Sequence, residues 1–385
     1  MGTMTWNQQT VKKNNKALVL QLIIEKEPIS RADISQVSGL HKATVSSLVS
    51  ELLDEDLIFE SGPGVSSGGR RPVILHFNKA AGYAIGVDIG VNYVRCVMTD
   101  LKGNIAGERH QPVKETPYHA ILDIVQNMIH SLMKDMAECR YGVVGIGVGV
   151  PGIINKEGSV LLAPNLHWEN ASLKNDLENL FQVPIVIENE ANAGAVAEMQ
   201  FGSGIAHSNI IYISAGIGIG TGIIIDGELF QGKNGFSGEM GHMIIEMNGK
   251  PCSCGSRGCW EAYASEHALM EFAGNGESLE TLLKKAEAGD EEAISLFRKI
   301  GHYLGFGINN IINTFNPDQV IIGNRLALAK EWIKQPILAT IENHTLAFHQ
   351  DEVQIDFSQL KNHSTALGVS AFVVENFIKG EAKSP

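Results

Sequence analysis

The sequence lacks two features that would place the protein in or across a membrane. No uninterrupted apolar run approaches the ~18 residues of a membrane-spanning helix. The first ten residues, MGTMTWNQQT, lack the basic and then apolar segments of a signal peptide. We therefore expect a protein without membrane contact that works in the cytoplasm.

Cysteine is also scarce and unevenly placed. Of the five cysteines, Cys96 and Cys139 stand alone, and the other three lie between positions 252 and 259. This arrangement excludes the disulfide framework of a small secreted domain. In a reducing compartment, a tight cysteine cluster favours a metal site.

The length and charge of the chain indicate more than one domain. A chain of 385 residues exceeds one ordinary core, and its hydrophobic (44%) and charged (19%) fractions are typical of globular proteins. The net charge of −13 disfavours a polyanion partner for the chain as a whole. Residues 1–80, however, carry nine basic and eight acidic side chains, so the acidity lies in residues 81–385. This division is typical of a nucleic-acid-binding module joined to a different domain.

The first part of the chain predicts a helix-turn-helix behind a longer first helix. Pro28 closes the first helix, and a second helix is expected over residues 31–38. Ser30 and Asp33 have the spacing of a capping box at its start. After a glycine turn, the third helix has apolar residues at i, i+3, i+4, i+7 and i+8. These apolar residues are Val45, Leu48, Val49, Leu52 and Leu53.

The solvent side of this third helix predicts contact with DNA. It carries short hydrogen-bonding side chains and one lysine instead of the Glu/Lys mixture of an ordinary solvated face. Such side chains suit base edges and phosphates. A small helical domain that binds another protein is the alternative interpretation. The predicted DNA-binding residues of this helix are His41, Lys42, Thr44, Ser46 and Ser47.

A β-hairpin with a glycine-rich loop is expected next. Two β-like runs, residues 57–60 and 73–77, flank the segment SGPGVSSGGRRP. Such a hairpin after a helix-turn-helix is the wing of a winged helix. Arg70 and Arg71 in its loop are suited to the minor groove or its phosphates. An ordinary flexible linker would have a similar composition.

Beyond residue 80 the pattern changes to short strands interrupted by glycines. The segments YAIGVDIGVNYVRCVMTDLKGNI and NIIYISAGIGIGTGIIIDGELF share one plan of strand, glycine turn and strand, about 125 residues apart. This repetition predicts a duplicated α/β fold with a cleft between its halves. The glycine turns at 88–90 and 216–222 are compatible with phosphate loops, or with close packing alone.

The cysteine cluster predicts a structural zinc site. Within 18 positions lie three thiols and one imidazole, together with glycines that allow tight folding. Three sulfurs and one nitrogen form a closed tetrahedral set without a position for catalytic water. The predicted ligands are His242, Cys252, Cys254 and Cys259.

A pair of carboxylates follows an apolar run in the segment IENEANAG. Glu188 and Glu190 bracket Asn189 at the end of an expected strand. Paired carboxylates serve acid or base chemistry in some enzymes, but acidic turns are far more common. The motif by itself leaves catalysis and binding open.

Together, these segments resemble the ROK family, which groups bacterial transcriptional repressors with sugar kinases. The resemblance covers nearly the whole chain and rests on SSGGRRP, ENEANAG, FSGEMGH and CSCGSRGCWE. It implies an N-terminal winged helix-turn-helix (residues 1–80) followed by a two-lobed actin-like fold. The first lobe would span 81–200, with a C-terminal helix at 365–385 packing back on it, and the second lobe would span 201–364.

The resemblance also implies which residues hold ligands. The zinc ligands given above match the structural zinc ligands of the family. The residues expected around the hydroxyls of a small sugar, D-xylose in the first place, are Asn165, Asn189, Glu190, Glu239, His242 and Glu261. Asn165 follows a proline, and an asparagine in that position is often only a turn residue.

The chain departs from the kinases of the family at catalytic positions. Glu190 stands where the kinases have the aspartate base, and an extra methylene misplaces a carboxylate enough to slow catalysis strongly. Asn92 and Ile217 stand where kinases have threonines, and Thr221 replaces a glycine. We therefore expect a homodimeric, sugar-released repressor of a palindromic operator and not an enzyme. The alternatives are an active kinase with a DNA-binding head and a repressor that responds to a hexose or a phosphorylated amino sugar.

Overall fold

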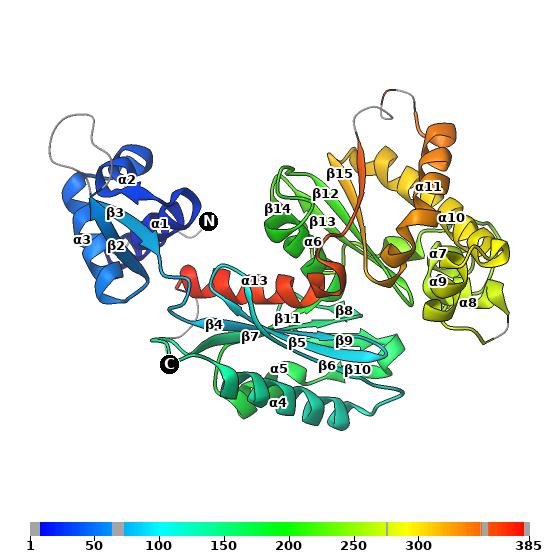
Figure 1. Ribbon diagram of the computed structural model, residues 1–385, viewed down its shortest axis with the longest axis horizontal. Helices are drawn as coiled ribbons and strands as arrows, with labels where there is room; N and C mark the ends of the chain where they lie inside the picture. Colours follow the sequence, from blue (N-terminus) through cyan, green and yellow to red (C-terminus); the bar gives the residue numbers. More distant parts are fainter. Residues whose placement is uncertain (1–7, 64–72, 275, 347, 349–352, 381–385) are drawn as a thin grey trace.

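The computed structural model describes residues 8–63, 73–274, 276–346, 348 and 353–380. Figure 1 shows three parts in sequence: an N-terminal head, a first lobe beside it, and a second lobe at the far end. The prediction of a winged helix followed by a two-lobed actin-like α/β fold is confirmed. Among the helices in the described ranges, none combines the length and apolarity needed to cross a bilayer.

The head contains the expected helix-turn-helix. The Ser30 hydroxyl accepts a hydrogen bond from the Asp33 N–H, and the Asp33 carboxylate accepts one from the Ser30 N–H, so the predicted capping box forms. Gly39 ends the second helix with φ +70°, a conformation that glycine adopts without strain. The helices are α1 (Gln8–Lys26), α2 (Arg31–Ser38) and α3 (Lys42–Asp54).

A small antiparallel sheet completes the winged helix. Strand β3 (Val73–Phe77) pairs with β2 (Ile58–Pro63) on one side and with β1 (Ile29–Ser30) on the other. The hairpin therefore lies where the sequence predicts it. Arg70 and Arg71 fall in the segment 64–72, outside the described residues.

The first lobe is built on a mixed five-stranded sheet. Its strand order is β11-β7-β4-β5-β6, with β7 parallel to β4 and β11, and β5 antiparallel to β4. Helices α4 and α5 cover one face and α13 covers the other (Figure 1). A second, three-stranded sheet of β8, β9 and β10 adjoins this lobe. The bounds are β4 (Tyr83–Ile89), β5 (Tyr93–Asp100), β6 (Ile105–Pro112), α4 (Tyr118–Asp135), β7 (Val143–Val150), β8 (Ile153–Ile154), β9 (Val160–Ala163), η1 (Pro164–Leu166), β10 (Trp168–Ala171), α5 (Leu173–Phe181) and β11 (Ile185–Asn189).

The second lobe repeats the pairing scheme of the first. Its sheet has the order β14-β13-β12-β15-β16, in which β12 is antiparallel to β13 and parallel to β15. Residues of this sheet and of the helices that follow it form one apolar core. The bounds are β12 (Ile210–Ala215), β13 (Ile219–Ile225), β14 (Glu228–Leu229), η2 (Met240–His242), α7 (Glu261–Ala264), α8 (Glu266–Ala273), α9 (Leu279–Glu287), α10 (Glu291–Phe315), β15 (Gln319–Gly323), η3 (Arg325–Ala329), α11 (Lys330–His344), β16 (Gln354–Phe357) and η4 (Lys361–His363).

Two helices form the contact between the lobes. Helix α6 (Glu190–Phe201) packs on β12 and β13, and α13 (Ser364–Ile378) packs on β4 and β7. The two helices cross closely, because a Cβ added to Gly368 would lie 1.8 Å from the carbonyl oxygen of Ala193. The sequence predicts the start of α13 within one residue. It does not predict α6, whose alanines and glycine are buried on all sides and show no amphipathic period.

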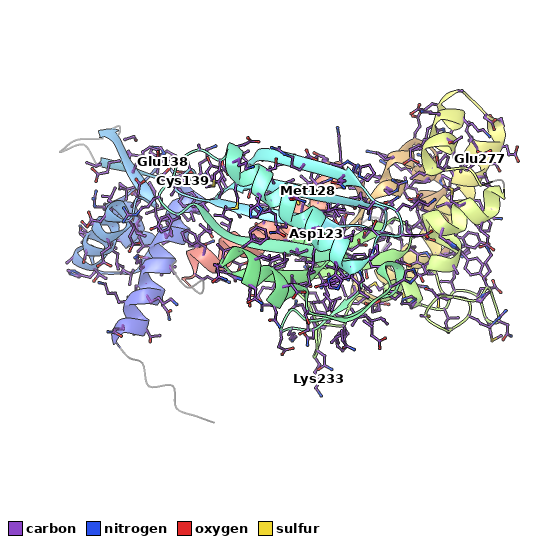
Figure 2. All side chains as sticks on the ribbon, turned by 90° about the horizontal axis from the view of Figure 1, so that it is seen from below. Asp123, Met128, Glu138, Cys139, Lys233 and Glu277 are labelled. Atoms are coloured by element: carbon purple, nitrogen blue, oxygen red, sulfur yellow. The ribbon has the colours of Figure 1, made fainter. Side chains whose placement is uncertain are left out.

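The head is docked on the first lobe. One apolar core joins head residues such as Val19 and Leu52 to Val144 of β7 and to Val373 of α13. The Arg140 guanidinium donates to the Asp54 carbonyl (2.7 Å), and the Tyr141 hydroxyl donates to the Glu55 carbonyl (2.9 Å). Figure 2 places Glu138 and Cys139, in the same loop of the first lobe, next to the head. The first lobe thus holds the C-terminal end of α3 directly.

Candidate functional site

A pocket of about 450 Å³ lies between the two lobes and gathers the sequence-predicted sugar residues. Asn165 comes from η1, and Asn189 and Glu190 come from the junction of β11 and α6. Glu239, His242 and Glu261 come from the second lobe and line the same pocket. The fold therefore brings all six residues to one cavity, although they span almost one hundred positions of the chain.

Asn189 is primarily a helix cap. Its side-chain oxygen accepts hydrogen bonds from the N–H groups of Ala191 (2.8 Å) and Asn192 (3.2 Å). Its side-chain nitrogen donates to the Gly152 carbonyl (2.9 Å). These bonds start α6 and fix the junction at the pocket wall. An asparagine between a strand and a helix is the sequence signal for such a cap.

The two carboxylates of the ENE segment have different surroundings. Glu188 is buried and accepts hydrogen bonds from the Asn189 N–H (2.8 Å), Asn192 (3.0 Å) and Gln231 (2.8 Å). Burial raises the pKa of Glu188, and these three donors oppose the rise. Glu188 therefore braces the junction, while Glu190 is the carboxylate that lines the pocket.

Glu190 is half-buried, and its Oε1 accepts a hydrogen bond from the Ser214 hydroxyl (3.1 Å). Burial raises the pKa of Glu190, and the donor at Ser214 opposes the rise. A partly desolvated carboxylate held in this way is suited to accept hydrogen bonds from the hydroxyls of a neutral ligand.

Asp88 is a further carboxyl close to the pocket that the sequence analysis treated only as part of a glycine turn. It is 2% exposed, and its Oδ2 accepts a hydrogen bond from the Tyr93 hydroxyl (2.8 Å). Burial, together with the charge of Glu190, raises the pKa of Asp88 to about 7. An acidic residue near the end of a buried strand is the sequence signal for such a group.

The four predicted metal ligands lie together. One ligand atom from each of them falls within 4.8 Å of all the others. The Cys252 sulfur is 3.6 Å from the His242 Nδ1, and the sulfurs of Cys254 and Cys259 are 3.7 Å apart. Around zinc at the usual Zn–S distance of ~2.3 Å, tetrahedral ligands are about 3.8 Å apart, so the set could hold a metal ion of this kind.

His242 belongs to both sites. Its Nδ1 faces the thiols and is 3.6 Å from Oε1 of Glu261, while its Nε2 is 3.9 Å from Oε2 of Glu239. The ligand loop is closed by isolated bridges, among them the one between Ile244 and Cys259. A metal here would therefore fix one wall of the pocket.

The kinase-related positions also lie at this pocket. Asn92, Ile217 and Thr221 line it together with the glycines of both turns. The Thr221 hydroxyl donates to the Gly238 carbonyl, which ties the second glycine turn to the segment FSGEMGH. The glycine turns thus contribute to the same cavity as the carboxylates.

The predicted DNA-binding residues lie at the start of α3. His41, Lys42, Ser46 and Ser47 are exposed, and Thr44 is half-buried. His41 is the N-cap, and its Nδ1 accepts from the Ala43 N–H (3.4 Å). The structure therefore presents this group of side chains on one end of the third helix, away from the core of the head.

A winged helix docked on the first of two lobes that enclose a polar cleft defines a class of protein that combines a DNA-binding head with a ligand-binding body. Residues 84–376 match the family described as "ROK family", and the chain belongs to this family.

Three known proteins show how far the similarity extends. The chain is 43% identical over 375 residues to the "Xylose repressor" of Bacillus spizizenii, which covers 97% of this chain and 98% of that protein. A crystal structure described as a ROK family transcriptional regulator, homolog of the E. coli MLC protein, has a TM-score of 0.83 and 28% identity, and covers 96% of this chain and 97% of that one. A ROK family glucokinase from Streptomyces griseus, in complex with glucose and AMPPNP, has a TM-score of 0.70 and 28% identity. The glucokinase match covers 99% of that enzyme but 76% of this chain.

Proposed function

We propose that the protein is a sugar-responsive transcriptional repressor of sugar-utilisation genes, with D-xylose as its effector. The observation that carries the proposal is the presence, in one chain, of a winged-helix head and a cleft lined by hydroxyl-binding side chains. The similarity to a protein named "Xylose repressor" includes the head as well as the body, because it covers 97% of the chain.

The head binds operator DNA through α3. Two copies of the protein, as a homodimer, place their third helices in successive major grooves of a palindromic operator. The exposed residues His41, Lys42 and Ser47, with Thr44 and Ser46, contact base edges and phosphates. Arg70 and Arg71, by their place in the sequence, extend the contact to the minor groove.

The cleft binds the sugar. Glu190, Glu239 and Glu261 accept hydrogen bonds from its hydroxyls, and Asn165, Asn189 and His242 complete the set. Zinc on His242, Cys252, Cys254 and Cys259 holds the wall that carries Glu239 and Glu261. This zinc is structural, because four protein ligands leave no position for a reacting group.

The protein is a repressor and not a kinase in this proposal. Glu190 replaces an aspartate base, and Asn92 and Ile217 replace threonines in the glycine turns. The likeness to a glucokinase favours one second candidate, a sugar kinase that carries a DNA-binding head. Transfer of the γ-phosphoryl group of ATP to a sugar at an ordinary turnover rate would establish this second candidate.

Isothermal titration with D-xylose and then D-glucose, each followed by a gel shift on a candidate palindromic operator, tests the proposal. We expect saturable D-xylose binding that releases the DNA. Glucose-driven release would assign a hexose effector instead, and a panel with phosphorylated amino sugars covers the other alternative. Because coupling between two sites is reciprocal, operator DNA must weaken sugar binding by the same factor. Equal sugar affinities with and without operator would contradict the model.

A further inference from the structure

A chain of hydrogen bonds runs from Glu190 into the second lobe. The Ser214 hydroxyl donates to Oε1 of Glu190 (3.1 Å), and the side-chain nitrogen of Asn324 donates to the Ser214 oxygen (2.9 Å). The side-chain oxygen of Asn324 accepts from the Arg325 N–H (2.7 Å). Because an amide nitrogen only donates, the single proton of the Ser214 hydroxyl is directed toward the carboxylate.

The three residues come from both sides of the lobe junction. Glu190 begins α6 directly after β11 of the first lobe, whereas Ser214 lies in β12 and Asn324 follows β15. Strands β12 and β15 are parallel neighbours, which places Ser214 opposite Gly323 and next to Asn324. Ser214 is 2% exposed, so its hydroxyl bonds the carboxylate away from competing water.

The backbone of Asn324 is held in an unfavourable conformation. Its φ of +64° and ψ of −162° lie in a region that is essentially reserved for glycine and is strained for any other residue. The Asn324 side chain fits in its place because position 216 is glycine. A Cβ at position 216 would lie 2.9 Å from the side-chain nitrogen of Asn324. Strain of this kind is retained where a specific side chain is needed in a specific place.

We infer that Ser214 and Asn324 are positioning residues that orient the Glu190 carboxylate toward a hydroxyl of the bound sugar. With Oε1 engaged by Ser214, the described residues form no hydrogen bond to Oε2, which leaves this oxygen available to accept from the sugar. The inference rests on the proposed sugar-binding function and adds to it two second-lobe residues, the buried Ser214 and Asn324, which itself lines the pocket. It also makes sugar affinity depend on how the second-lobe sheet is placed against α6.

A matched pair of variants at position 214 tests the inference. Threonine and valine have the same shape, but only threonine keeps the hydroxyl. We expect Ser214→Val to weaken D-xylose binding at least tenfold, and Ser214→Thr to restore most of it, by isothermal titration of the full-length protein. A merely structural role of Ser214 would lower the Tm of both variants and leave their sugar affinities equal. Equal affinities of the two variants would overturn the inference.

A second pair of variants tests the hydrogen bond from Asn324 to Ser214. Asn324→Gly removes the donor to Ser214 but suits the local backbone, so we expect an unchanged or higher Tm with D-xylose affinity lowered about threefold. Asn316→Gly is the matched control, because Asn316 also has a positive φ (+44°) but lies at the end of α10 and does not line the pocket. Its sugar affinity should equal that of the wild type. An unchanged affinity of Asn324→Gly would remove Asn324 from the mechanism, whereas absence of sugar binding by the wild type would overturn the proposed function itself.

Discussion

At the scale of single residues, burial and a neighbouring charge move the pKa of the Asp88 carboxyl into the neutral range. Its pKa of about 7 lies well above the usual value near 3.8, because it is buried and close to Glu190. The folded protein therefore keeps a proton on Asp88 that the unfolded chain has already lost. The stabilisation from this proton is complete below the unfolded pKa and is lost as the pH rises toward 7.

We predict that Asp88→Asn flattens this part of the pH dependence of stability. An asparagine oxygen can still accept from the Tyr93 hydroxyl, but the side chain has no proton to lose. The Tm of the wild type should fall relative to that of the variant by a few degrees between pH 5.5 and pH 7.5, measured by scanning calorimetry. Parallel Tm curves for the two proteins would show that Asp88 does not titrate in this range.

The two glutamates of the ENE segment show how much one residue depends on its surroundings. They are two positions apart and chemically identical, and the sequence could not assign their roles. The Glu188 carboxylate accepts three hydrogen bonds because it lies near the end of a buried strand, beside Asn192 and Gln231. Glu190 faces the pocket because the helix cap at Asn189 turns the chain there.

At the scale of elements, the segment that carries the cysteines is joined by turn and loop hydrogen bonds and not by long strands or helices. Residues 243–259 contain isolated bridges and little regular structure, and Ile244 and Met247 are 62% and 83% exposed. Thiolates brought this close together repel one another unless a cation holds them. A metal on these four ligands would therefore add to the contacts that fix the geometry of the segment.

We predict that removing zinc weakens sugar binding and leaves the head intact. Metal analysis of the untreated protein should give one zinc per chain. Chelation, or the variant Cys259→Ser, should remove this zinc. D-xylose affinity should fall at least tenfold, because Glu239 and Glu261 lose their fixed wall. Operator binding in the absence of sugar should change little, since the head lies at the other end of the molecule (Figure 1). Full sugar affinity in a metal-free protein would contradict this role.

The sequence predicts those helices whose capping and apolar signals lie close together in the chain. The bounds of α2 agree with those predicted, because its cap and apolar spacing lie within ten residues. The sequence does not predict helix α6, because β12, β13 and α13 bury it on all sides. Its apolar and polar residues therefore do not alternate with a helical period.

At the scale of the whole molecule, the docked head determines how a sugar signal can reach DNA. Helix α13 contacts both the pocket wall and the head. The Thr365 hydroxyl is 3.4 Å from the Glu190 carbonyl, and Val373 lies in the apolar core shared with the head. Arg140 and Tyr141 add direct hydrogen bonds from the first lobe to the end of α3. The head and first lobe are therefore expected to move together.

We predict that the double variant Arg140→Ala/Tyr141→Phe uncouples the two sites. D-xylose affinity should equal that of the wild type, because the pocket is untouched. The factor by which sugar weakens operator binding should fall several-fold, since the orientation of α3 is no longer fixed to the lobe. Arg109→Ala is the control: the hydrogen-bond partners of Arg109 are Glu108, Ser131 and Asp135, all in the first lobe, and its loss should leave the coupling factor unchanged. Retained coupling in the double variant would exclude this contact as the route.

The sequence by itself determined the winged helix, the cluster of one histidine and three cysteines, and the family, because each rests on residues close together in the chain or on their spacing. Only the tertiary structure decided which carboxylate faces the cavity, which residues of the second lobe hold it, and how the head is attached. Ser214 and Asn324 are 110 positions apart, and Arg140 is 86 positions from Asp54. Such contacts arise from the packing of two sheets and the helices between them, and no local pattern records them.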